Sequence, residues 1–477
     1  MEIRNIPTTG QTRREHDLLG ELDIPVEYYF GVQTMRAVDN FNISRVTLNL
    51  FPEFIKGLAD TKQGAAMANR DLGLLDPQIA EAIIKACEEV RAGKFNDHFV
   101  VDMVQGGAGT STNMNANEVI ANRALELMGH EKGEYQYCHP NNHVNLSQST
   151  NDAYPTAIHV AMVRSIEKLV AALTELVAAF RAKGVEFANV IKMGRTQLQD
   201  AVPMTLGQEF ESYAATLEDE IKVLNENMKY FYEINMGATA IGTGINADPD
   251  YADLCTKHMA SVTGMPLVKA HNMIAATNDT SAFVMNSSAQ KRLAVKLSKI
   301  CNDLRLMGSG PRCGLSEIHL PARQPGSSIM PGKVNPVIPE VVNQVCFRVI
   351  GNDLTITAAA EAAQLELNVM EPVIVHCMFE SIEMMVNAMN TLREKCIVGI
   401  KANEEVCRKL VYNSIGLVTA LNPYLGYETS TALAKEALQS GKGIYDLVLE
   451  HELMSKERLD EILKPENMVK PRKFVKK

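Results

Sequence analysis

Long segments with a helical period dominate the chain after residue 150. In one of them, Ile158, Met162, Ile166, Leu169 and Leu173 recur every three or four residues, which places them on one face of an α-helix. Five segments carry this pattern, at about 151–180, 210–231, 281–306, 339–367 and 372–400. Long helices with this much apolar surface bury it against one another. The pattern predicts a mainly helical protein, built on an elongated bundle and assembled into an oligomer.

Size and composition narrow the class of protein. A length of 477 residues predicts more than one domain. The net charge of −10 argues against a nucleic-acid surface, which carries basic stripes, so local donors must bind any anionic ligand. Nine scattered cysteines without a CxxC pair favour a reducing compartment. With a polar N-terminus and no long apolar run, the sequence predicts a cytoplasmic protein without a membrane segment.

The most informative irregular segment is the Gly- and Pro-rich stretch 308–339. Its residues 326–336 read GSSIMPGKVNP. Two hydroxyls, a cation and a carboxamide are what is needed to hold a carboxylate and to remove a proton beside it. A polar surface loop is the alternative interpretation. Since residues 326–336 contain no His, Asp or GxSxG sequence, they do not indicate a Ser-His-Asp hydrolase.

Three further polar clusters lie elsewhere in the chain. Residues 106–113 read GGAGTSTN, 147–152 read SQSTND and 194–200 read GRTQLQD. Glycines allow close backbone approach to a ligand in the first cluster. The second precedes a long helix, whose N-terminus can bind an anion through free N–H groups; capping explains some of its polar residues but not all. The third lies between two long helices, where a simple connecting loop is the alternative.

Two other motifs are weaker candidates. Residues 242–247 read GTGINA, but a dinucleotide fingerprint needs a preceding strand and a following helix. Here a long helix precedes the motif and DPD follows, so we reject a dinucleotide site. Cys138, His139 and His143 resemble part of a zinc site without a fourth ligand at a suitable spacing. A hydrogen-bonded turn is the favoured interpretation, and a three-ligand catalytic site is the weaker one.

The four polar clusters, in this order, closely resemble those of the fumarase/aspartase superfamily over nearly the whole chain. Within it, the details are similar to aspartate ammonia-lyases rather than class II fumarases. GAGTSTNMN stands at 107–115 where fumarases typically read GSGTQSNMN. QSTND replaces QSSND at 148–152, and NPVIPEVVNQV follows the signature loop in place of NPTQCE. Many members carry His in a GRTH motif, paired with a Glu; here Gln197 takes that position and Glu340 remains.

The resemblance implies a fold and an assembly. We expect a mainly α, three-domain fumarase/aspartase-like fold whose central five-helix bundle forms a twenty-helix core in a homotetramer. The expected domains are a mixed, mainly helical N-terminal domain at 1–149, a central helical bundle at 150–405 and a small helical domain at 406–477. Each active site would draw residues from three subunits. This explains why the polar clusters lie so far apart in the sequence.

The resemblance also implies the chemistry, which is the reversible anti-elimination of ammonia from L-aspartate to give fumarate in amino-acid catabolism. Ser327 is expected to be the base, helped by backbone N–H groups and by Lys333. The other implied contacts are Thr110, Ser149, Thr150 and Ser328 to the β-carboxylate, Thr196, Lys333 and Asn335 to the α-carboxylate, and Asn151 and Gln197 to the amino group. No cofactor or metal is expected to be required for the chemistry, although activation by a divalent cation stays open.

Two alternative functions are a class II fumarase and a non-catalytic member of the superfamily. A class II fumarase would run the same chemistry with water as the leaving group, which needs a proton that Gln197 cannot readily supply. An ammonium group already carries its proton, so the change from His is easier to tolerate in an ammonia-lyase. A non-catalytic member, as some lens crystallins are, would not need Ser327, Lys333 and Asn335, and all three are present.

Overall fold

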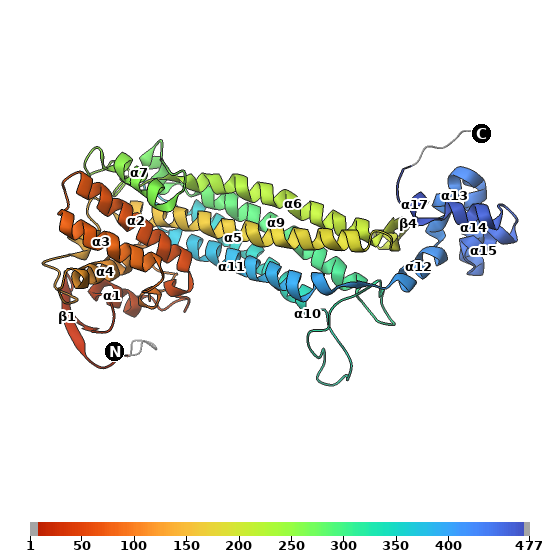
Figure 1. Cartoon of the computed structure of the whole chain (residues 1–477), viewed down its shortest axis with the longest axis horizontal. Helices are drawn as coiled ribbons and strands as arrows, with labels where there is room; N and C mark the ends of the chain where they lie inside the picture. The colour runs from red at the N-terminus through yellow and green to blue at the C-terminus, as the bar shows by residue number, and fades with distance from the viewer. Residues whose placement is uncertain (1–7, 472–477) are drawn as a thin grey trace. The chain divides into compact units, whose positions relative to one another are not determined.

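The structure is a computed structural model in which residues 8–471 are described. Helices make up most of it, and the strands pair two by two (Figure 1). The α-helices are α1 (Val32–Asn40), α2 (Pro52–Asp71), α3 (Pro77–Arg91), α4 (Thr110–Leu127), α5 (Thr150–Glu186), α6 (Leu206–Met228), α7 (Tyr251–Thr263), α8 (Met273–Asn278), α9 (Ser281–Met307), α10 (Val337–Glu361), α11 (Glu371–Lys395), α12 (Glu404–Asn413), α13 (Val418–Leu425), α14 (Tyr427–Ser440), α15 (Ile444–Glu450), α16 (Lys456–Ile462) and α17 (Pro465–Met468). The strands are β1 (Thr12–Asp17), β2 (Gly20–Pro25), β3 (Ile191–Thr196), β4 (Gln199–Thr205), β5 (Glu233–Ile234), β6 (Val268–Lys269), β7 (Ile318–His319) and β8 (Lys401–Ala402).

The five long helical segments predicted from periodicity are confirmed as α5, α6, α9, α10 and α11. The longest, α5, has 37 residues. Helix α9 ends at Met307 and α10 begins at Val337. The stretch between them contains only the two-residue strand β7 as regular structure, as its glycines and prolines predict. No helix within residues 8–471 is both long and apolar enough to cross a membrane.

The chain divides into two compact units. Unit 1 contains Met1–Val170, Lys222–Arg292 and Arg348–Met385, and unit 2 contains Ala171–Ile221, Leu293–Phe347 and Val386–Lys477. The five long helices each contribute one part to each unit. The predicted three-domain boundaries at 149 and 405 stay a prediction.

In unit 1, helices α2, α3 and α4 pack together beside the first part of α5. Gly57 of α2 allows the close approach, because a Cβ atom there would lie 2.3 Å from the Ala157 carbonyl oxygen of α5. The long helices also contact one another in this unit. Lys291 of α9 lies 2.6 Å from Asp353 of α10, and Asn352 of α10 donates to Glu380 of α11 at 2.7 Å. This packing holds the starts of α4 and α5 in one framework.

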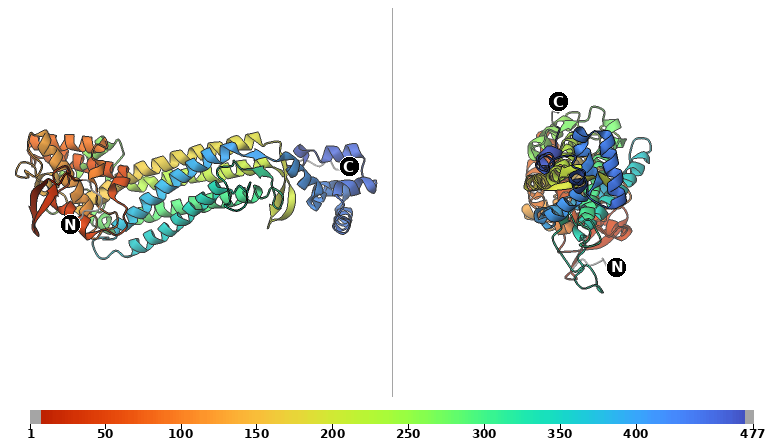
Figure 2. Two further views of the ribbon diagram at one scale, coloured as in Figure 1. Left: turned by 90° about the horizontal axis from the view of Figure 1, so that it is seen from below. Right: turned by 90° about the vertical axis from the view of Figure 1, so that its right-hand side faces the viewer.

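In unit 2, the remaining parts of the long helices pack side by side. Arg181 of α5 pairs with Glu218 of α6 at 2.9 Å, and Asn343 of α10 donates to Ser298 of α9 at 2.9 Å. The residues from Glu404 to Met468 form a small cluster of helices, drawn in blue in Figure 2. Ile191 and Met193 of β3 belong to the hydrophobic core of that cluster. The β3–β4 hairpin is therefore anchored by the C-terminal helices.

Candidate active site

The first predicted cluster ends in a tight turn that begins α4. Gly107 and Gly109 have φ angles of +89° and +91°, a region that strongly favours glycine. A Cβ atom at Gly109 would lie 2.5 Å from the ring of Tyr154, so this glycine is also needed for space. Thr110 is exposed as the first residue of α4, and its hydroxyl donates to the Gly107 carbonyl at 2.8 Å.

The second predicted cluster caps α5. The Ser149 N–H donates to Asp152 Oδ1 at 2.9 Å, and the Asn151 N–H donates to Ser149 Oγ at 3.2 Å. The other carboxylate oxygen of Asp152 accepts from the N–H groups of Gly237 and Thr239, at 3.1 and 2.8 Å. Burial raises the pKa of Asp152 to about 6. These contacts hold the start of α5 against the Gly-rich loop that follows β5.

Asn151 has its side-chain orientation set by that same loop. Its Nδ2 donates to the Ala240 carbonyl at 2.7 Å. The amide carbonyl oxygen Oδ1 is thereby left to accept a hydrogen bond. An acceptor is what an ammonium group requires, which agrees with the predicted contact between Asn151 and the substrate amino group.

The structure brings the first two clusters together. Asn113 Nδ2 of α4 donates to Thr150 Oγ1 at the start of α5, at 3.1 Å. Two helix N-termini therefore lie next to each other, with the hydroxyls of Thr110, Ser149 and Thr150 at their first turns or caps. Free N–H groups and helix dipoles make such a place suitable for an anion. The arrangement fits the predicted carboxylate contacts.

Buried residues that were not predicted as site residues contact the side chains beside the starts of α4 and α5. Lys62 of α2 is fully buried, and its Nζ lies 2.7 Å from Asn113 Oδ1, 3.0 Å from Asn145 Oδ1 and 2.8 Å from Gln148 Oε1. Burial lowers the pKa of Lys62 to about 7, and the charge of Asp152 opposes that change. Lys62 belongs to the polar run Asp60–Gln63 within a helical segment, and that run by itself did not indicate a role at the site.

In unit 2, residues 326–336 form a loop closed by its own hydrogen bonds. The Gly326 N–H donates to the Lys333 carbonyl at 2.7 Å, and Asn335 Nδ2 donates to the Gly326 carbonyl at 2.7 Å. A Cβ atom at Gly326 would lie 2.8 Å from both the Lys333 carbonyl oxygen and the Asn335 backbone nitrogen. Gly326 and Asn335 therefore set the shape of the loop.

Ser327 occupies the turn inside this loop. Its Oγ accepts from the N–H groups of Ile329 and Met330, at 3.2 and 3.1 Å. Hydrogen bonds donated to an oxygen favour its negatively charged form. The geometry therefore supplies the backbone N–H groups that the sequence analysis expected for a serine base. Ser328 and Lys333 are exposed beside it, and Ile329 is 83% exposed, so the loop presents its side chains outward.

The third predicted cluster is a β-hairpin rather than a simple connecting loop. Thr196 and Gln199 pair at its end, and Gln197 and Leu198 both have positive φ angles, 56° and 61°. Two positive φ angles define the tight turn that suits paired strands. Asn-Gly is the usual sequence for such a turn, so the sequence carried no clear signal here. Thr196 and Gln197 are exposed at the tip.

Buried charges anchor the base of this hairpin. Arg195 pairs with the fully buried Glu317 at 2.9 Å, and Lys192 pairs with Glu209 at 2.6 Å. At the start of α10, Glu340 lies in the first helical turn and is partly buried.

The predicted site residues thus fall into two sets. Thr110, Ser149, Thr150 and Asn151 belong to unit 1, where α4 and α5 begin. The members that belong to unit 2 are Thr196, Gln197, Ser327, Ser328, Lys333 and Asn335. Their roles toward a substrate stay predictions.

The two weaker motifs form other structures. The residues Pro140–Val144 form a π-helical turn in which His139 Nδ1 accepts from the Asn141 N–H at 3.0 Å and His143 Nδ1 accepts from the His139 N–H at 2.8 Å. This agrees with the predicted hydrogen-bonded turn. Across residues 8–471, no group of three or more His, Cys, Asp or Glu side chains is arranged to hold a metal ion. Residues 242–247 do follow a short strand, β5, which the sequence analysis missed. That strand pairs only with β6, so the sheet of a dinucleotide-binding domain is lacking there.

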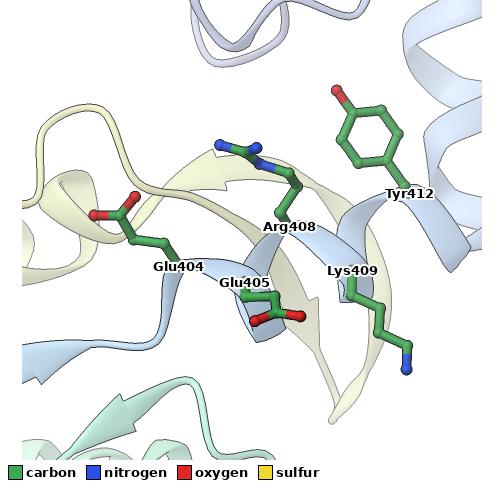
Figure 3. Close-up of a pocket in the computed structure, with 5 residues that line it drawn as sticks. All are labelled: Glu404, Glu405, Arg408, Lys409 and Tyr412. Carbon is green, nitrogen blue, oxygen red and sulfur yellow. The ribbon is translucent and has the colours of Figure 1, made fainter.

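A hollow on the surface of α12 contains none of the predicted site residues. Figure 3 shows Glu404, Glu405, Arg408, Lys409 and Tyr412 around it. Two acidic and two basic side chains line it, so the hollow has no single sign of charge.

Comparison with known proteins shows the family to which the chain belongs. The family profile described as "Lyase" matches residues 20–351, and the one described as "Fumarase C C-terminus" matches residues 417–470. The structure of a fumarate lyase:delta crystallin from Brucella melitensis, bound to cobalt, superposes with a TM-score of 0.94 at 53% identity, covering 97% of this chain and 100% of that one. The chain therefore belongs to the fumarase/aspartase family of lyases, and the predicted fold class is confirmed.

Within this family, the curated relatives are named more narrowly. An aspartate ammonia-lyase from Pseudomonas fluorescens is 60% identical over 471 residues, which cover 98% of each chain. A class II fumarase from Schistosoma mansoni has the same fold, with a TM-score of 0.89, but is 36% identical over 95% of this chain and 98% of its own.

Proposed function

We propose that the chain is an aspartate ammonia-lyase, which converts L-aspartate to fumarate and ammonia and reverses that reaction. The observation that carries this proposal is the 60% identity to an enzyme of that name along almost the full length of both chains. Gln197 supports the same choice, because its neutral amide can hold an ammonium group but cannot readily protonate a leaving hydroxide.

The proposed reaction begins at C3 of aspartate. Ser327 Oγ, in its deprotonated form, takes the C3 proton, and the electron pair of that bond moves into the β-carboxylate to form an enediolate. The pair then returns to form the C2–C3 double bond, and the C2–N bond breaks. The nitrogen leaves as ammonia with the bond electrons, since it entered as an ammonium group. Donors that hold the enediolate more tightly than the carboxylate lower the barrier.

The residue roles follow from which groups can donate. Hydroxyls at the two helix N-termini, with Ser328, would hold the β-carboxylate as its charge grows. Thr196, Lys333 and Asn335 would hold the α-carboxylate, and the free Oδ1 of Asn151 would accept from the ammonium group together with Gln197. The exposed loop 326–336 would close over the substrate, exclude water and bring Ser327 to the proton.

We propose further that the enzyme is a homotetramer whose active sites are shared among subunits. Phe347, Ile350 and Leu354 of α10 are 61%, 36% and 72% exposed in the isolated chain. Their spacing puts them on one face of the helix. An apolar face of this kind is normally covered by a partner, and copies of the same helix bundle would cover it in a twenty-helix core.

The proposal also includes a cytoplasmic location and chemistry that proceeds without a cofactor or metal. All nine cysteines are free and eight are buried, which suits a reducing compartment. The chemistry above uses only protons, hydroxyls, amides and a lysine. Turnover should therefore persist after treatment with a chelator, and a rise on adding magnesium would indicate activation rather than a chemical requirement.

A direct assay tests the proposed activity. Purified protein is incubated with L-aspartate or with L-malate, and fumarate is followed by its ultraviolet absorbance. Fumarate and an equal amount of ammonia should form from aspartate, and far more slowly from malate if at all. Faster turnover of malate would make the chain a fumarase, and no turnover of either would favour a non-catalytic role.

A further inference from the structure

The geometry points to Lys62 as a positioning residue that, through Asn113, directs the hydroxyl proton of Thr150 toward a bound carboxylate. This inference rests on the proposed function, because it takes Thr150 to contact the substrate. It concerns a buried side chain that is not itself expected to touch the substrate.

Lys62 is surrounded by amide oxygens rather than carboxylates. Its Nζ lies 2.7, 3.0 and 2.8 Å from the side-chain oxygens of Asn113, Asn145 and Gln148. An ammonium group has three N–H donors and no acceptor. Three acceptors therefore match the charged form of Lys62, and each of the three amides must turn its oxygen, and not its nitrogen, toward Nζ.

That orientation determines what Asn113 offers on its other side. With Oδ1 facing Lys62, Nδ2 faces Thr150 Oγ1, at 3.1 Å, and Asn145 Oδ1, also at 3.1 Å. An amide nitrogen only donates. Thr150 Oγ1 is thereby the acceptor in this bond, and its one hydroxyl proton must point to another partner.

A carboxylate at the helix N-terminus is the partner that this arrangement suits. Thr150 is the first residue of α5 and is partly exposed. A hydroxyl that is already accepting a hydrogen bond is a stronger donor, because hydrogen bonds in a chain polarise one another. If the Asn113 amide were reversed, its oxygen would face Thr150, and the hydroxyl would donate inward instead of to the substrate.

Lys62 also places a cation behind the two helix N-termini. Asp152 is the acidic group whose charge favours the ammonium form of Lys62, and the thiols of Cys87 and Cys255 are the other titratable groups facing Lys62. A fully buried lysine carries a large desolvation cost. An apolar side chain would fill the same volume without that cost, so packing alone does not account for a cation here.

Asn113→Leu is the most informative substitution, because it keeps a similar shape, adds no charge and removes the donor to Thr150. Thr150→Val removes the hydroxyl itself. Each variant should bind succinate, an unreactive dicarboxylate, roughly 10- to 100-fold more weakly than the parent, as expected for a lost hydrogen bond to a charged group. The double variant should bind no more weakly than Thr150→Val alone, because both changes act on one donor.

Lys62→Met should give the same pattern, with little further loss when it is combined with Thr150→Val. Lys62→Arg retains donors and should recover part of the affinity. Lys183→Met is the matched control, since Lys183 is a buried lysine of α5 in unit 2 that bonds Glu186 at 2.7 Å. Oligomer size and melting temperature, measured for every variant, show whether a loss of binding reflects loss of assembly.

Two outcomes would overturn the inference. One is unchanged succinate binding by Asn113→Leu. The other is a double variant whose loss equals the product of the two single losses, since independent effects multiply. If Lys62→Met does not fold, the Asn113 and Thr150 variants still decide the matter. Failure of the parent to turn over aspartate would refute the proposed activity but not this series, which measures binding only.

Discussion

Replacing Ser327 by alanine tests the base assignment most directly, with Ser328→Ala as its matched control. The two serines are neighbours in the same loop, but their surroundings differ. Ser327 Oγ accepts two backbone N–H groups, from Ile329 and Met330, at 3.2 and 3.1 Å. Ser328 is exposed beside it. Ser327 alone is therefore placed to carry a negative charge.

The size of the effect follows from those two hydrogen bonds. A hydrogen bond to a charged group stabilises it by about 1.5–3 kcal/mol, so two would favour the Ser327 alkoxide by about 3–6 kcal/mol. A general base contributes about 10²- to 10⁴-fold to a rate. Because the C3 proton is a weak acid, Ser327→Ala should lower turnover by about 10⁴-fold or more. Ser328→Ala removes one donor to the carboxylate and should cost about 10- to 10³-fold, by analogy with oxyanion donors.

The assay compares initial rates of fumarate formation with the affinity for succinate. Both variants should still bind succinate, because the donors at α4 and α5 are unchanged. Circular dichroism and oligomer size verify that each variant is folded and assembled. If Ser328→Ala were the more damaging in turnover, with binding intact in both, the base would be Ser328 and the reasoning from the two N–H groups would be wrong.

Three further predictions concern specificity, assembly and stability. Gln197→His should leave deamination measurable but change its pH profile, because the imidazole titrates near neutral pH; superimposable profiles would contradict the role given to Gln197. Mixing inactive Ser327→Ala and Thr196→Val tetramers should restore some activity after subunit exchange, whereas no recovery after proven exchange would mean that each site belongs to one chain. Burial raises the pKa of Glu371 from 4.5 to about 8, so the folded protein keeps a proton that the unfolded chain loses, and stability falls as pH rises from about 4.5 to about 8. Glu371→Gln cannot ionise, so between pH 5 and 8 its free energy of unfolding should fall by up to about 4 kcal/mol less than that of the parent. The change in melting temperature between pH 5 and pH 8 measures this, and an equal change in Glu371→Gln and in the exposed control Glu366→Gln would refute it.

Much of the fold could be predicted because its signals are local. A helix repeats every 3.6 residues, so the apolar positions of α5 and α9–α11 were readable along the chain. Glycine and proline interrupt helices wherever they cluster, which located the irregular stretch between Met307 and Val337. The four polar motifs lie in short continuous segments, and they were sufficient to predict the family, the lyase reaction and the candidate residues. The comparisons confirm the family and the reaction, while the residue roles await the variants above.

Other features depend on contacts between distant parts of the chain, which a local pattern does not encode. The turn at Gln197 and Leu198 lacks the Asn-Gly signal, and its strand β3 is held by the core of the C-terminal helices. Lys62 has the sequence setting of an ordinary helical residue, yet the packing of α2, α4 and α5 buries it among three amides. Asn113 and Thr150 are 37 residues apart in the sequence and 3.1 Å apart in space. Sequence motifs identify which donors are present, but only tertiary packing decides which way each donor points, because its orientation depends on partners brought in from other elements.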